Sequence, residues 1–131
     1  MLHLIKLSPE ITIKSRVVRR RFTRQLRKNL FRVLKEFDEK IEVLGKWDSI
    51  EVNTAVSDDS CNFRVRDRLQ NTPGVGQVCL VEKHKLPSMD LMLELTRNAY
   101  SGSLKGKSFA VRCKRTGDHS FSSVDIERFV G

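Results

Sequence analysis

The chain has 131 residues, of which 39% are hydrophobic and 31% are charged. This length suits one ordinary domain or two very small ones, and the hydrophobic fraction supports a modest core. No apolar run approaches the roughly 20 residues of a membrane span, and the first residues have neither the core nor the cleavage site of a signal peptide. We therefore expect a cytoplasmic protein without membrane attachment.

The cysteines agree with this location. Cys61, Cys79 and Cys113 are widely spaced and form no C-x-x-C pair, so we expect neither a disulfide framework nor a zinc site. The simplest interpretation is three reduced, small hydrophobic side chains.

The positive charge of the chain is concentrated in one stretch. The net charge is +9 and the isoelectric point is about 9.9, and the residues from Ile11 to Lys35 include no Asp or Glu. Ten of the 25 basic residues fall here, so 15 remain elsewhere against 16 acidic ones. They are Lys14, Arg16, Arg19, Arg20, Arg21, Arg24, Arg27, Lys28, Arg32 and Lys35. Such a localised excess is typical of a surface that binds a polyanion.

The first elements are a strand and a long helix. Residues 2–7 form a short apolar run that predicts a buried strand, interrupted before Pro9. From Arg16 to about Phe37, apolar residues recur at helical spacing and predict an amphipathic helix. Its expected buried stripe is Val18, Phe22, Leu26, Leu30, Val33 and Phe37. At about 100° per residue, the basic side chains that lie opposite this stripe are Arg20, Arg24, Arg27, Lys28 and Lys35.

The next elements complete a recognisable order. Residues 41–43 and 50–52 alternate around a turn-forming segment at 45–48 and predict a hairpin. Residues 58–60 can cap a second helix that runs to about Asn71, and residues 75–81 form another apolar strand. The order strand, helix, strand, strand, helix, strand is that of the split βαβ, ferredoxin-like arrangement.

The remaining residues predict three more elements. A third helix is expected to start at residues 86–88 and to stop at Ser101-Gly102. Residues 108–115 alternate between apolar and basic side chains, which predicts a half-buried strand with a basic open face. Ser122 and Asp125 resemble a capping box, and because this last helix has barely begun at Gly131, we expect an incomplete domain.

Two stretches carry a resemblance to a known family. The first comprises residues 9–15 (PEITIKS), followed by Arg19-Arg20-Arg21-Phe22 and Leu26; the second comprises residues 109–131 (FAVRCKRTGDHSFSSVDIERFVG). With residues 47–52 and 72–75, they resemble the amino-terminal portion of the bacterial tRNA 4-thiouridine synthetases, sulfurtransferases that also serve thiamine biosynthesis. The second stretch resembles the opening of a THUMP domain, an RNA-binding module of tRNA-modifying enzymes.

The resemblance implies an α+β chain of two parts. A ferredoxin-like domain would occupy residues 1–82, and the first part of a THUMP domain, truncated here, would occupy residues 83–131. Together they would hold the acceptor end of tRNA. The longer enzyme would use ATP and magnesium to activate uridine 8 of tRNA, and would replace an oxygen with sulfur from a cysteine desulfurase.

The catalytic parts of that family are not expected within these residues. The family's ATP-binding loop, S-G-G-x-D-S, has no match, and the nearest stretch, Ser101-Gly102-Ser103, lacks the second glycine and the Asp-Ser pair. We therefore predict no catalytic residue, no metal ligand and no cofactor in residues 1–131. Asp125 and Glu127 would point different ways on a helix and cannot share an acid–base centre.

The candidate RNA-binding residues are Lys14, Arg20, Arg24, Arg27, Arg112, Lys114, Arg115 and His119. Arginine binds phosphates bidentately and releases counterions from RNA. A solvated helical face is the alternative interpretation, although like charges without an acidic residue at i±4 destabilise a helix. His119 could stack on an unpaired base or serve only local packing.

Other functions remain open from the sequence. The chain could belong to another THUMP enzyme, such as a tRNA methyltransferase, or it could be a ferredoxin-like ligand-binding or oligomerisation domain. Attachment to a membrane surface through the basic helix is a third possibility, with little binding expected. An uncovered sheet edge could also drive dimer formation or domain swapping.

Overall fold

The computed structural model describes residues 1–85 and 88–131, which form two compact units, Met1–Lys83 and His84–Gly131. Each unit is described separately below. The expected border between the two domains was after residue 82.

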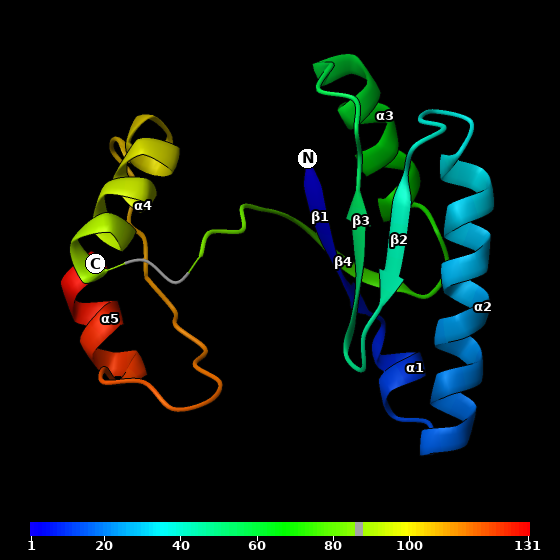
Figure 1. Cartoon of the computed structure of the whole chain (residues 1–131), viewed down its shortest axis with the longest axis horizontal. Coiled ribbons are helices and arrows are strands. Elements are labelled where there is room, and N and C mark those ends of the chain that lie inside the picture. The colour runs from blue at the N-terminus through cyan, green and yellow to red at the C-terminus, as the bar shows by residue number, and fades with distance from the viewer. Residues whose placement is uncertain (86–87) are drawn as a thin grey trace. The chain divides into compact units, whose positions relative to one another are not determined.

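Unit 1 contains a four-stranded antiparallel sheet (Figure 1). Its strands are β1 (Leu2–Leu7), β2 (Glu42–Gly45), β3 (Ser49–Asn53) and β4 (Val75–Val81), in the spatial order β2-β3-β1-β4. In the centre, Ile5 of β1 pairs with Ile50 on one side and with Val78 on the other. This order, with a helix after β1 and another after β3, is the ferredoxin-like arrangement, so that prediction is confirmed.

Three helices belong to unit 1: α1 (Pro9–Thr12), α2 (Arg16–Leu34) and α3 (Asp59–Gln70). Pro9 does not only end β1 but begins the short α1, because proline fits the first turn of a helix. Asp58 caps α3 by accepting a hydrogen bond from the Cys61 amide, as its sequence position predicts. The long helix α2 ends at Leu34, before the expected Phe37.

The core lies between one face of the sheet and the helices α2 and α3. Alternate strand residues such as Ile5, Ile50 and Val52 pack there against Leu26, Leu30 and Leu34 of α2 and against Val65 and Leu69 of α3. The buried stripe of α2 therefore differs from the expected one. Leu34 is fully buried, whereas Phe22 is 50% exposed, because the buried face of α2 centres on Leu30 and is rotated about the helix axis relative to the expected stripe. With the helix in this orientation, several arginines that were expected on its outer face lie on the flank beside β2.

Unit 2 consists of α4 (Met89–Leu104), α5 (Ser123–Val130) and the irregular segment between them (Figure 1). The predicted capping box of α5 is present, with Ser122 and Asp125 bonded reciprocally. Ser88 caps α4, but residues 86 and 87 of the expected helix start lie outside the described residues. The expected stop at Ser101-Gly102 is wrong: both residues are helical, and the chain turns at Gly106, whose φ is +72°.

The strand expected at residues 108–115 does not form. Residues 107–116 have no strand structure, because the described part of unit 2 contains no other strand to complete a hydrogen-bond ladder. The Cys113 amide instead donates a hydrogen bond of 2.8 Å to the Glu127 carboxylate. None of the helices in residues 1–85 and 88–131 is both long and apolar enough to cross a membrane.

Candidate nucleic-acid interface

A groove runs between α2 and the turn that joins β2 to β3. Its volume is about 260 Å³, and one wall is formed by successive turns of α2 while the other is the hairpin turn. The lining residues are Arg19, Arg20, Thr23, Arg24, Arg27, Gly45, Lys46 and Trp47. Three of the predicted RNA-binding residues, Arg20, Arg24 and Arg27, are thus brought together in one place.

The wall formed by α2 carries uncompensated positive charge. Arg20, Arg24 and Arg27 are exposed, and the ion pairs found within the described residues involve other side chains, Lys46 and Lys83 with Glu51. Adjacent like charges on one helix repel each other. An anion placed in the groove would relieve this repulsion, and phosphate matches the guanidinium fork.

Gly45 marks a place where the helix and the hairpin approach each other. A Cβ atom at this position would lie 3.4 Å from Cδ of Arg27. The side chain of Arg27 therefore passes close to the end of β2, at a distance that is ordinary van der Waals contact for a Cβ atom.

The opposite wall presents an aromatic ring. Trp47 lies in the turn and is 51% exposed. The Arg19 guanidinium lies 4.3 Å from its ring centroid and donates a hydrogen bond of 2.9 Å to the Trp47 carbonyl. This cation–π contact and the hydrogen bond fix the position of the turn against α2.

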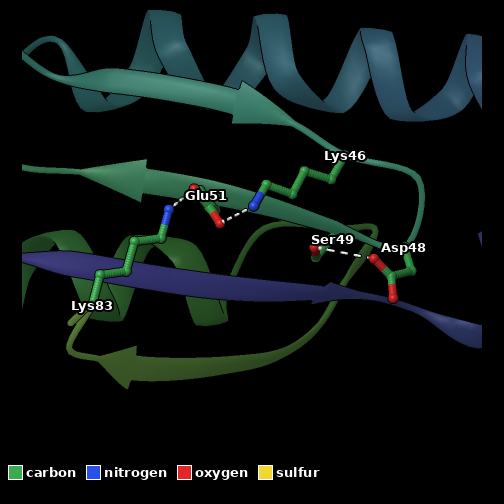
Figure 2. A network of polar contacts seen from close by, with 5 residues as sticks. All are labelled: Lys46, Asp48, Ser49, Glu51 and Lys83. Carbon is green, nitrogen blue, oxygen red and sulfur yellow. Dashed lines mark hydrogen bonds and ion pairs between the residues drawn. The ribbon is translucent and has the colours of Figure 1, made fainter. Parts of the chain in front are cut away.

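The turn is also held from the other side of the sheet by an ion-pair network (Figure 2). The Glu51 carboxylate of β3 accepts hydrogen bonds from Lys46 in the turn and from Lys83 after β4. These two hydrogen bonds hold the pKa of Glu51 below its ordinary value. Within the turn, the Ser49 hydroxyl donates to the Asp48 carboxylate at 3.3 Å. The Lys46 ammonium is thus engaged by Glu51, although the residue also lines the groove.

Lys14 is exposed in the connection between α1 and α2 and does not line the groove. It is therefore the one predicted RNA-binding residue of unit 1 that the groove does not include.

The other four predicted residues, Arg112, Lys114, Arg115 and His119, belong to unit 2. Arg115 donates hydrogen bonds to the carbonyls of His119 and Phe121, at 3.2 Å and 3.0 Å. The His119 ring stacks on Phe121 with centroids 5.2 Å apart and bonds the Thr116 carbonyl at 2.8 Å. These two residues organise the loop before α5, while Arg112 is exposed on the preceding segment.

Sequence reasoning does not select five of the lining residues: Arg19, Thr23, Gly45, Lys46 and Trp47. Residues 45–48 predict a turn and residues 47–52 contribute to the family resemblance, but neither pattern indicates a binding site. The available signal was the single tryptophan of the chain, placed beside a lysine in a hairpin turn, where a large aromatic ring has no core to fill. That this turn faces α2 follows from tertiary structure alone.

Neither a metal-ligand cluster nor a glycine-rich phosphate loop is found among residues 1–85 and 88–131. No three His, Cys, Asp or Glu side chains gather there in a cluster suited to a metal. Ser101-Gly102-Ser103 lies inside α4, where backbone amides are used by the helix, whereas a phosphate loop presents free amides at a helix N-terminus.

Comparison with known proteins identifies the relatives of this chain. The profile of the ThiI ferredoxin-like domain matches residues 2–79. Similar proteins include the tRNA sulfurtransferases of Pseudomonas aeruginosa (strain LESB58), Azotobacter vinelandii (strain DJ / ATCC BAA-1303) and Pseudomonas fluorescens (strain Pf0-1). They are 45%, 46% and 42% identical over 128 residues.

Each of these alignments covers 98% of this chain but 26% of the relative. The chain therefore spans about a quarter of the length of the curated relatives that it matches. No solved structure matches the chain.

Proposed function

Because this chain belongs to the ThiI ferredoxin-like domain family, we propose that it is a tRNA-binding part of a tRNA sulfurtransferase. The observation that carries the proposal is the row of Arg20, Arg24 and Arg27 along one wall of the groove, with no acidic partner in the described residues. Three guanidinium groups on successive turns of a helix can follow a run of phosphates. The relatives named as tRNA sulfurtransferases make tRNA the natural polyanion.

The proposal extends to the longer protein. There, uridine 8 of tRNA is converted to 4-thiouridine with ATP and magnesium, sulfur comes from a cysteine desulfurase, and the same sulfur transfer supports thiamine synthesis. These steps belong to residues outside this chain, since residues 1–131 contain no S-G-G-x-D-S loop. Residues 1–131 bind the acceptor end of tRNA and present the tRNA to the catalytic residues of the longer protein.

In this proposal, unit 2 is the beginning of a THUMP domain and also contributes to RNA binding. Arg112 and Lys114 supply positive charge on the irregular segment between α4 and α5, and Arg115 holds the loop that follows. A THUMP methyltransferase is the competing assignment. The names of the relatives favour sulfur transfer, because the similarity covers nearly the whole chain.

The proposal is tested by tRNA binding to the 131-residue chain across a salt series, measured by fluorescence anisotropy. Each phosphate contact lowers the logarithm of the binding constant by roughly 0.9 per tenfold increase in salt. We expect the variant R20E/R24E/R27E to bind at least tenfold more weakly and to have a salt slope lower by about 2 to 3.

The matched control is R21E/K28E/R32E, which reverses three charges on the solvent side of the same helix, outside the groove. It changes the net charge equally, so it measures the general effect of charge on the encounter with RNA. Equal losses in both variants would show that the groove has no special part in binding. Binding that ignores salt would overturn the proposal itself.

A further inference from the structure

We infer that the groove accepts an unpaired nucleotide, with its base stacked on Trp47 and its phosphates on the arginines of α2. This inference rests on the proposed function and adds which form of RNA the site takes. It assigns to Trp47 a direct contact with RNA, and to Arg19 the role of a positioning residue behind the ring.

The first observation is the exposure of Trp47. It is the only tryptophan in the chain, and it stands in a hairpin turn with half of its surface in water. A side chain of this size is most favourable when buried, and any small polar residue could form the turn. The exposed indole therefore has no part in the core of unit 1.

The second observation is that the ring is already held in place. The Arg19 guanidinium lies 4.3 Å from the ring centroid and is fixed by a hydrogen bond to the Trp47 carbonyl, and Arg16 lies 5.9 Å away. The turn is further anchored by Lys46 on Glu51. A ring fixed in this way loses little conformational freedom when a base stacks on it.

The third observation is the position of the ring beside the phosphate-binding charges. Trp47 lines the same groove as Arg20, Arg24 and Arg27. An aromatic ring beside a row of cations is the combination by which proteins bind single-stranded nucleic acid, since each base offers a π-face and each linkage offers a charge.

A duplex does not fit this arrangement equally well. Its bases are stacked on one another, and the deep major groove of an RNA helix keeps their edges out of reach. A duplex could therefore satisfy the arginines but would leave Trp47 in water, whereas an unpaired nucleotide would use both walls. The two modes of binding differ in what Trp47 contacts, so they can be separated by experiment.

The test uses the 131-residue chain, whose single tryptophan reports directly on stacking. Two probes are titrated: a blunt RNA hairpin closed by a non-nucleotide linker, so that it contains no unpaired base, and the same hairpin with a short single-stranded extension. We expect the extended hairpin to quench the fluorescence of Trp47 and to bind about tenfold more tightly than the blunt one. The blunt hairpin is expected to leave the fluorescence nearly unchanged.

Two variants complete the test. W47A is expected to lose the preference for the extension, so that both hairpins bind with the affinity of the blunt one, while W47F keeps most of the preference because it retains an aromatic ring. A circular dichroism spectrum checks that the variants fold. The quenching of Trp47 is measured on the unaltered chain, so this part of the test does not depend on the folding of a variant.

Equal affinity for both hairpins, without quenching, would overturn the inference and leave the proposed function standing. A chain that binds neither hairpin nor tRNA would instead contradict the proposed function.

Discussion

Glu51 lies on the face of the sheet that the helices do not cover, yet only 7% of its side chain is exposed. The two lysines that bond it, Lys46 and Lys83, are themselves 53% and 62% exposed. A carboxylate removed from water keeps its charge only when hydrogen bonds replace the solvent. The two lysines provide these bonds and thereby join the groove turn to the end of unit 1.

The first prediction concerns this carboxylate. The variant E51Q should lower the free energy of unfolding by about 1 kcal/mol, because the charge-assisted hydrogen bonds of Glu51 are lost. The loss stays small because water hydrates the released lysine ammonium groups. The loss should shrink at high salt. It should also shrink progressively as the pH falls from about 4.3, where the unfolded carboxylate protonates, through the lower pKa of the folded Glu51. Urea unfolding at two salt concentrations measures it. The control is E42Q, an exposed glutamate of β2; equal effects of the two substitutions would contradict the account.

A second prediction at this scale concerns His3, a residue of β1 that is 2% exposed on the core side of the sheet. Burial lowers the pKa of His3, and the positive charges of the N-terminus and Arg66 lower it further. The unfolded chain therefore binds a proton before the folded one does, so stability should fall as the pH drops below about 6.5.

Urea unfolding between neutral and mildly acidic pH measures this effect of His3. The variant H3L should remove most of the pH dependence in that range. H119Q, which changes a histidine of unit 2 outside the core of unit 1, should retain it. The same pH dependence in H3L and in the unaltered chain would show that another group titrates.

At the scale of elements, two glycines should respond in opposite ways to the same substitution. Gly74 joins α3 to β4 with a φ of +94°, and a Cβ atom there would lie 3.1 Å from Ile11 and 3.2 Å from Leu26. Gly102 lies inside α4, and beyond the helix's own backbone no atom of residues 1–85 and 88–131 lies within 4 Å of such an atom. G74A should therefore destabilise β4 by about 1 to 3 kcal/mol, whereas G102A should stabilise α4 by about 0.5 to 1 kcal/mol. Amide hydrogen exchange in each element measures both, and destabilisation by G102A would contradict the helical assignment.

Elements whose sequence pattern is local were predictable. The caps at Asp58 and Ser122 and the hairpin around residues 45–48 follow from a few adjacent residues. The segment 108–115 has an equally clear alternation and forms no strand, because a strand also needs a partner that no local pattern supplies. The end of α4 was misplaced at Gly102 because one glycine costs a helix only about 1 kcal/mol, less than a favourable run around it provides.

The groove also combines features that adjacent residues predict with features that depend on tertiary packing. The arginines of α2 were predictable from the absence of acidic residues over residues 11–35. Their position on the flank of the helix was not, because it depends on the rotation that buries Leu34. Trp47 and Lys46 join them only through the packing of α2 against β2, which the sequence does not display.

At the scale of the whole molecule, positive charge is divided between two units joined by a single connection. The groove of unit 1 and the segment of unit 2 around Arg112 each offer few contacts, and a few phosphate contacts bind RNA weakly at physiological salt. If both units hold one tRNA, the second contact is made at the high effective concentration set by the connection. The affinity of the chain then depends on both units at once.

This dependence gives the last prediction. R112E/K114E should weaken tRNA binding about tenfold, although these residues lie in the unit that does not contain the groove, and adding R20E/R24E/R27E should weaken it further. Anisotropy titration with tRNA at fixed salt measures both steps. K105E/K107E is the control, because it reverses two exposed charges in the loop after α4. If R112E/K114E and the control bind alike, unit 2 does not touch the RNA that the groove holds, and tRNA binding by this chain belongs to unit 1 alone.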